Sequence, residues 1–287
     1  MKLQGKRAVV TGSSQGLGLA IARQLLADGA SVLICARNPM DLSTAQAELD
    51  AAYPGRAFAV RCDIAKETEV EALAASATEL LGGVDILVCN AGVYGPKGGI
   101  DTLDWGAWVN AMQVNLIGTV YCCRVFLPLL RQAARGKVLI ISGGGATKAL
   151  PFLSAYAASK AGVVRFAETL AEELKPEGID VNAIAPGALN TRLLDEVLAA
   201  GPEVVGEAFY KASLKQRDNG GTPLSVGAEL CSYLASAESD GVTGKLISAQ
   251  WDPWRRIAEF QNELMASDIW TLRRIIPAER GKDWDQS

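Results

Sequence analysis

The chain has 287 residues, of which 49% are hydrophobic and 21% are charged, and its formal net charge is -4. It is long enough for one large domain with a substantial core, and the mildly acidic balance gives no support for nucleic-acid binding. The absence of histidine excludes a His-dependent catalytic triad and a His-ligated zinc site, and no other metal site is expected.

The sequence shows no targeting or membrane-spanning pattern. Residues 1–18 pass from polar residues straight into a strand and a glycine turn. The most apolar stretch, Thr119–Leu130, contains Arg124 and is too short to cross a bilayer. The six cysteines lack paired C-x-x-C spacing, which is typical of small buried side chains in a reducing compartment. We therefore expect a cytoplasmic protein without a membrane partner.

Strands and helices alternate along the first half of the chain. Residues 7–12 predict a buried strand, and residues 16–29 predict a helix that ends at Gly29. The alternation continues with strands at 31–37, 57–64 and 84–92, and with helices at about 39–52 and 66–81.

The second half repeats this pattern. Helices are expected at about 106–133 and 154–174, and strands at 137–144, 180–187 and 244–250. The strands are apolar throughout, so each is expected to be buried on both faces within a parallel sheet covered by helices. The fold class is therefore α/β, a single Rossmann-type doubly wound domain over residues 1–250. Residues 251–287 form an extension, packed on that domain or on an oligomer partner.

Three glycines lie between the first strand and the first helix. In TGSSQGLG, Gly12 suits a tight turn, Gly16 suits close approach of a phosphate, and Gly18 suits packing of helix against strand. The helix N-terminus then offers free N–H groups to a pyrophosphate. This turn predicts a dinucleotide site.

Tyr156 and Lys160 are four residues apart at the start of a predicted helix and share one helix face. A nearby ammonium favours the phenolate form and lowers the pKa of a tyrosine. Such a pair makes an acid–base catalyst, although the same spacing also occurs on ordinary helix surfaces.

The ordered motifs resemble the short-chain dehydrogenase/reductase family over roughly residues 5–250. The motif T-G-x-x-x-G-x-G is followed by Asp63, by NAG at 90–92, by Asn115 and by Y-x-x-x-K. The resemblance implies catalytic roles for Tyr156, Lys160 and Asn115, with Asn115 holding a water for proton relay. It implies cofactor contacts at Gly12, Ser14, Gly16, Leu17, Gly18, Asp63, Asn90, Ala91, Gly92, Tyr156, Lys160, Pro186, Gly187 and Thr191.

The end of the second strand indicates the cofactor. A carboxylate there usually binds the ribose 2′-hydroxyl of NAD, but this chain has Ala36 followed by Arg37. A guanidinium can bind a 2′-phosphate, so NADP(H) is favoured over NAD(H). The alternative is that Arg37 is a surface arginine.

The family's serine, thirteen residues before the tyrosine, is replaced by Gly143. We predict that Ser142 or the backbone of the glycine run supplies the missing hydrogen-bond donor. Thr147, Ser154 or a substrate hydroxyl are alternatives, and loss of carbonyl chemistry is a third explanation.

The substrate side is expected at Gly143–Ala146, Leu150–Ser154 and 188–223. Phe152, Leu153, Asn190 and Tyr210 are candidates there, though each also suits packing. Trp251 and Trp254 either anchor the extension or stack on a substrate.

The expected function is NADP(H)-dependent interconversion of an alcohol and a carbonyl on a small organic substrate. Alternatives are a sugar or nucleotide-sugar oxidoreductase with substrate-assisted catalysis, and a non-catalytic cofactor-binding regulator. The resemblance implies a homotetramer or homodimer, paired through the helices that carry Asn115 and Tyr156.

Overall fold

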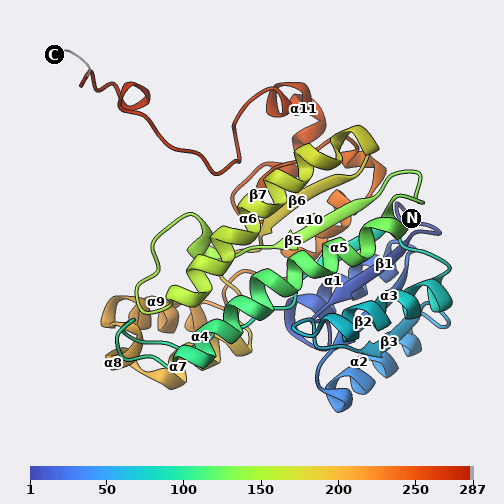
Figure 1. Cartoon of the computed structure of the whole chain (residues 1–287), viewed down its shortest axis with the longest axis horizontal. Coiled ribbons are helices and arrows are strands. Elements are labelled where there is room, and N and C mark those ends of the chain that lie inside the picture. Colours follow the sequence, from blue (N-terminus) through green and yellow to red (C-terminus); the bar gives the residue numbers. More distant parts are fainter. Residues whose placement is uncertain (285–287) are drawn as a thin grey trace.

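The computed structural model describes residues 1–284 and shows a central sheet between two layers of helices (Figure 1). Within these residues the sheet has seven strands, all parallel, in the order β3-β2-β1-β4-β5-β6-β7. The predicted fold class is thereby confirmed. The strands are β1 Arg7–Thr11, β2 Ser31–Ala36, β3 Ala57–Arg61, β4 Ile86–Cys89, β5 Lys137–Ile141, β6 Asp180–Ala185 and β7 Leu246–Ser248.

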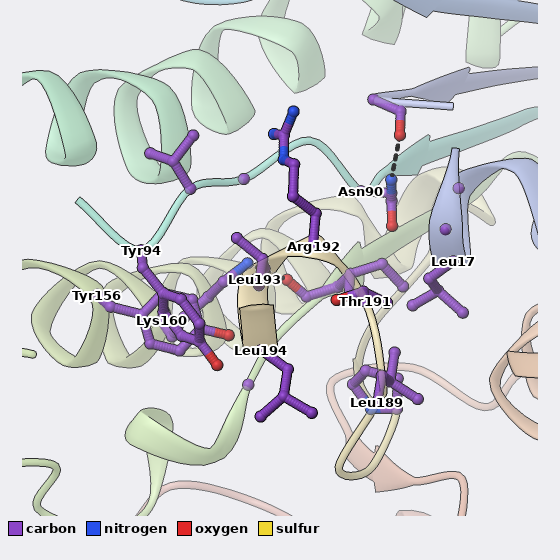
Figure 2. A pocket seen from close by; sticks show the side chains of 18 of the residues that line it. Leu17, Asn90, Tyr94, Tyr156, Lys160, Leu189, Thr191, Arg192, Leu193 and Leu194 are labelled. Carbon is purple, nitrogen blue, oxygen red and sulfur yellow. Dashed lines mark hydrogen bonds between the residues drawn. The ribbon is translucent and has the colours of Figure 1, made fainter. Parts of the chain in front are cut away.

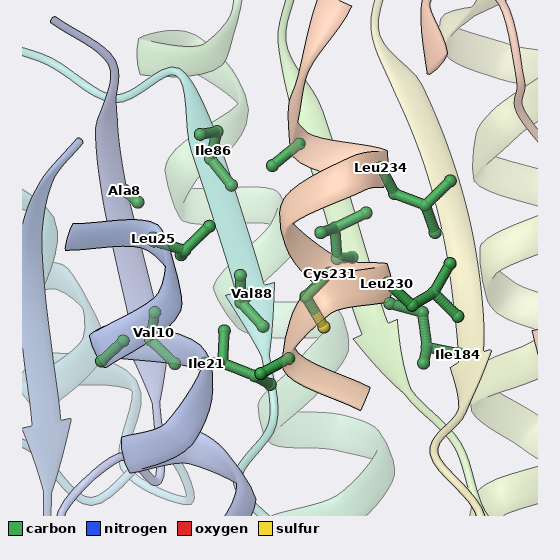
Figure 3. Packing of buried hydrophobic residues seen from close by; sticks show 14 of the residues in the cluster. Ala8, Val10, Ile21, Leu25, Ile86, Val88, Ile184, Leu230, Cys231 and Leu234 are labelled. Carbon is green, nitrogen blue, oxygen red and sulfur yellow. The ribbon is translucent and has the colours of Figure 1, made fainter. Parts of the chain in front are cut away.

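Apolar side chains leave both faces of each central strand. In β5, Leu139 and Ile141 belong to the core beneath α1 and α10, while Val138 and Ile140 belong to the core beneath α3, α5 and α6. Figure 3 shows the first of these cores between helix and strand side chains. The helices are α1 Gly16–Ala27, α2 Pro39–Ala52, α3 Glu67–Leu81, α4 Trp105–Met112, α5 Gly118–Leu130, α6 Ser154–Leu174, α7 Arg192–Ala200, α8 Pro202–Val205, α9 Glu207–Asp218, α10 Leu224–Ala235 and α11 Ile257–Met265.

The helix predicted at 106–133 is interrupted. A π-helical turn, η1, over Gln113–Ile117 separates α4 from α5. By length and composition alone the continuous run Trp105–Leu130 could cross a membrane, but 44% of its most apolar window is buried within the fold. Helix α10, in a stretch for which the sequence analysis predicts no element, covers the sheet beside α1.

The order of the strands indicates where a ligand crevice is expected. Strand β1 lies between β2 and β4, so the chain moves outward in opposite directions from this point. In open α/β sheets, ligands bind at the carboxyl ends of the strands next to such a switch point. Helices α7, α8 and α9, from the predicted substrate segment 188–223, gather at one end of the molecule near the start of α6 (Figure 1).

The extension first packs on the domain and then leaves it. Trp254, Ile257 and Leu264 are buried in the core beneath α10, and the Leu246 amide of β7 donates to the Trp270 carbonyl at 2.7 Å. The core therefore continues past the boundary predicted at residue 250. Residues 273–284 lead away from the body of the molecule (Figure 1).

Candidate active site

A cavity of about 1420 Å³ lies at the carboxyl ends of the strands and joins the glycine turn to Tyr156 (Figure 2). Most of the predicted site residues line it, and Asn115 is the exception. The predicted residues that line it are Gly12, Ser14, Gly16, Leu17, Gly18, Arg37, Asp63, Asn90, Ala91, Gly92, Ser142, Tyr156, Lys160, Pro186, Gly187 and Thr191.

The glycine turn has the shape that a pyrophosphate requires. Gly12 has φ +63° and a Cβ there would lie 2.6 Å from Ala91 Cα, so only glycine fits. The Asn90 side-chain amide donates to the Thr11 and Gly12 carbonyls at 2.9 Å each and holds the turn against β4. Helix α1 starts without a side-chain cap, which leaves its N-terminal N–H groups available for phosphate. These residues fit a dinucleotide.

At the far end of the cavity, Arg37 follows Ala36, the last residue of β2. The Arg37 side chain is exposed, and within residues 1–284 it makes no hydrogen bond or ion pair. The next side chain, Asn38, is already engaged, because it accepts from the Met40 and Asp41 amides and caps α2. Arg37 is therefore the cation available to an anionic group at this end.

Lys160 is buried and directed towards β5. Its Nζ donates to the Ile141 carbonyl at 2.8 Å and lies 5.7 Å from the centroid of the Tyr156 ring. Burial lowers the pKa of Lys160 to about 8. The lysine therefore remains predominantly an ammonium at neutral pH.

The expected lowering of the Tyr156 pKa by Lys160 is not found. Burial raises the pKa of the Tyr156 phenol above its ordinary value, and Tyr94 raises it further. Loss of hydration disfavours the phenolate, and the Lys160 ammonium bonds to a carbonyl rather than to the phenol. Tyr156 is thus protonated at neutral pH, the form that donates a proton.

Asn115 lies in the π-helical turn η1, outside the cavity lining, and bonds to residues next to the site. Its Oδ1 accepts from the Val93 amide at 2.8 Å, and its Nδ2 donates to the Val93 carbonyl at 2.8 Å and to Ser159 Oγ at 2.9 Å. These bonds tie the loop after β4 to η1 and α6. The predicted water-holding role of the residue stays a prediction.

Gly143 faces the tyrosine. A Cβ on Gly143 would lie 2.9 Å from Tyr156 Cζ and closer still to the hydroxyl oxygen, so the phenol occupies the space of a side chain at this position. The backbone at Gly143 is extended, which turns the neighbouring Ser142 side chain the opposite way. Ser142 Oγ is buried and has no hydrogen-bond partner among residues 1–284. Its predicted role as donor stays a prediction.

Only some of the residues predicted for the substrate side line the cavity. Asn190 and Thr147 line the cavity, whereas Ser154 Oγ accepts from Trp108 Nε1 at 3.1 Å. Trp251 is 78% exposed at the cavity rim, while Trp254 is a buried anchor. Phe152, Leu153 and Tyr210 do not line the cavity.

Tyr94 is a lining residue that the sequence analysis missed. Its ring meets the Tyr156 ring edge-on, with centroids 4.6 Å apart. Its position two residues after the NAG motif could have indicated this, because the loop after β4 leads into the site.

Comparisons with known proteins agree with this geometry. A family model described as short chain dehydrogenase matches residues 6–200, more than half of the chain. Among curated proteins, the chain is 32% identical to 2-dehydro-3-deoxy-L-rhamnonate dehydrogenase (NAD(+)) of Sphingomonas sp. (strain SKA58), over 84% of this chain and 95% of that protein.

Two solved structures with bound NADPH are also similar. Actinorhodin polyketide ketoreductase is 31% identical, with a TM-score of 0.77 over 85% of this chain and 95% of that one. A short chain oxidoreductase from Pseudomonas aeruginosa PAO1, described as containing an atypical catalytic center, is 30% identical. Its TM-score is 0.76 over 87% of this chain and 98% of that one.

Proposed function

Because this chain belongs to the short-chain dehydrogenase family, and so is an NAD(P)-dependent oxidoreductase, we propose that it interconverts a carbonyl and an alcohol on a small organic substrate using NADP(H). The observation that carries the proposal is one cavity that joins the uncapped N-terminus of α1 to the buried pair Tyr156 and Lys160. Phosphate binding and proton transfer thereby share a single space.

The roles follow from the side chains. When bound, the cofactor supplies or accepts the hydride. Tyr156, protonated at neutral pH, gives its proton to the carbonyl oxygen in reduction. In oxidation Tyr156 first loses its proton to water, and the phenolate then takes the proton from the alcohol. Lys160 keeps a positive charge beside the phenol and offers its remaining N–H groups to the cofactor ribose.

The first experiment measures NADPH oxidation, and NADP reduction in reverse, over ketones, aldehydes, sugars, sugar acids and alcohols. Tyr156→Phe should lower kcat by roughly 10² to 10⁴, because it removes the general acid, while NADPH binding is kept. Tyr121→Phe is the matched control, since Tyr121 of α5 donates its hydroxyl hydrogen bond to Glu71 of α3, outside the cavity lining. Unchanged turnover in Tyr156→Phe would sink the assignment, and NADPH binding without any turnover would favour a regulator.

The preference for NADP(H) rests on Arg37. Arg37→Ala should weaken NADPH binding by roughly 10- to 100-fold, because a charge-assisted hydrogen bond to phosphate is lost, and should change NADH binding little. Arg61→Ala is the control, an arginine on the neighbouring strand paired with Glu69 at 3.0 Å and outside the cavity lining. Equal binding of NADH and NADPH by the wild type would refute the preference.

A sugar-derived substrate is the second candidate. The similarity to a sugar-acid dehydrogenase supports it, as do the polar side chains of Asn190, Gln216 and Arg217 at the substrate end. Turnover of 2-keto sugar acids, with none of simple ketones, would select this candidate.

A further inference from the structure

We propose that the Tyr94 hydroxyl donates a second hydrogen bond to the substrate oxygen that Tyr156 protonates, in place of the serine absent at Gly143. This inference rests on the proposed function and names one further catalytic residue for it. Tyr94 lies in the loop between β4 and α4, and its ring contacts the ring of Tyr156, whose hydroxyl lies next to Gly143.

The two phenols lie together in the cavity. Figure 2 shows Tyr94 and Tyr156 side by side with Lys160 next to them, and the two rings meet at an interplanar angle of 66°. Neither hydroxyl makes a hydrogen bond to another group within residues 1–284. Both are therefore free to bond a ligand oxygen at this end of the cavity.

A cation also lies near the Tyr94 ring. Lys97 Nζ lies 5.7 Å from the centroid of the Tyr94 ring, and the same Nζ pairs with Glu196 of α7 at 3.4 Å. The Lys97 side chain is only 12% exposed, so the cation remains at the ring. A phenol ring that contacts both a cation and a second ring is restrained, and a preorganised donor is what stabilisation of a developing oxyanion requires.

The other hydroxyls near Gly143 are less suited. Ser142 directly precedes Gly143 in extended backbone, where neighbouring side chains are expected to point opposite ways. Thr147 is exposed, and Ser154 accepts from Trp108. Tyr94 is the remaining hydroxyl that contacts the Tyr156 ring and also lines the cavity.

Both phenols carry their protons at neutral pH. Burial is the main cause that raises the pKa of Tyr94, followed by Glu196, and burial likewise raises the pKa of Tyr156. In reduction a bound NADPH would supply the hydride to the carbonyl carbon, and Tyr156 would give its proton to the oxygen. The Tyr156 phenolate then regains a proton from water, while Tyr94 keeps its own proton throughout.

Tyr94→Phe tests the assignment, since it keeps the ring contacts and removes only the hydroxyl. With the best substrate of the panel, kcat should fall by roughly 10² to 10³, the usual loss for one oxyanion donor. KM and the NADPH dissociation constant, measured by fluorescence, should stay within about twofold, because the bond strengthens in the transition state. Tyr121→Phe is the control, and thermal unfolding confirms that each variant folds.

Ser142→Ala is measured in parallel, because Ser142 is the competing hydrogen-bond donor. A kcat within threefold of wild type in Tyr94→Phe, or a large loss in Ser142→Ala alone, overturns the inference. Tyr156→Phe separates this failure from that of the proposed function. An active wild type, an inactive Tyr156→Phe and an active Tyr94→Phe sink only the role of Tyr94. If the wild type turns over no substrate of the panel, both the proposed function and the role of Tyr94 are refuted.

Discussion

At the scale of single residues, Gly143 makes this site unlike the pattern its family leads one to expect. The family's serine is absent, and the Tyr156 phenol occupies the space into which a side chain at Gly143 would point. Tyr94 also packs on the Tyr156 ring. Because Tyr156 contacts both the Gly143 position and Tyr94, a new side chain at Gly143 has no room unless the catalytic tyrosine moves.

Gly143→Ser is therefore expected to lower kcat by about tenfold or more, although it restores the family's residue. The reason is displacement of a positioned general acid, and small misplacements of reacting groups can cost on the order of 10² in rate. Steady-state kinetics with the best panel substrate measures the change. Gly144→Ser is the matched control, because a Cβ on Gly144 meets nothing within 4 Å. A gain in kcat for Gly143→Ser would contradict the account.

At the scale of elements, the π-helical turn η1 carries Asn115 to the loop after β4. π-Turns within α-helices are frequently found at functional sites. Here the turn allows one amide to bond both main-chain groups of Val93 and the Ser159 hydroxyl. Tyr94 is the next residue after Val93, so η1 fixes the loop that carries it.

Asn115→Ala should lower both stability and kcat. It leaves the part-buried Val93 amide and carbonyl without the Asn115 bonds, at up to about 1 to 3 kcal/mol per group, and it releases the loop that carries Tyr94. Urea unfolding and steady-state kinetics measure the two effects. The control is Asn182→Ala, since Asn182 also bonds two main-chain groups, Val242 and Lys245, but lies outside the cavity lining. Equal kcat values in the two folded variants would rule out the positioning role.

At the scale of the whole molecule, the extension divides into a packed part and a projecting part. Besides its three buried side chains, the packed part bonds across to α6, where the Leu272 amide donates to Glu168 Oε1 at 2.6 Å. Ile275 and Ile276 of the projecting part are exposed. The folding unit should therefore end close to residue 272.

Two truncations test this boundary. A chain ending at residue 274 should unfold within a few degrees of the full chain, because the removed residues lie beyond the core. A chain ending at residue 250 loses burial of Trp254, Ile257 and Leu264, roughly 1.5 to 3 kcal/mol each, which is comparable with the whole stability of many domains. Thermal unfolding and NADPH binding give the comparison. A chain ending at residue 250 that is as stable as the full chain would disprove the boundary.

The sequence alone was enough to predict the fold and most of the cavity. Apolar runs such as Val138–Ile141, repeated in alternation with helical patterns, are typical of interior parallel strands, and Gly12 has a conformation that other residues avoid. These properties are local, so they can be read from neighbouring residues. The sequence did not decide whether residues 251–272 pack on their own domain or on an oligomer partner, because the hydrophobic pattern of a segment does not show which surface it packs against.

Only the tertiary structure decided how the acid–base centre is arranged. Tyr94 and Tyr156 are far apart in sequence, and their contact depends on how the β4 loop, η1 and α6 pack together. The direction of the Tyr156 pKa shift also depended on this packing, because burial outweighs an ammonium whose hydrogen bond goes to a carbonyl. Side-chain type determined which groups this protein has for catalysis, and three-dimensional packing determined which of them meet.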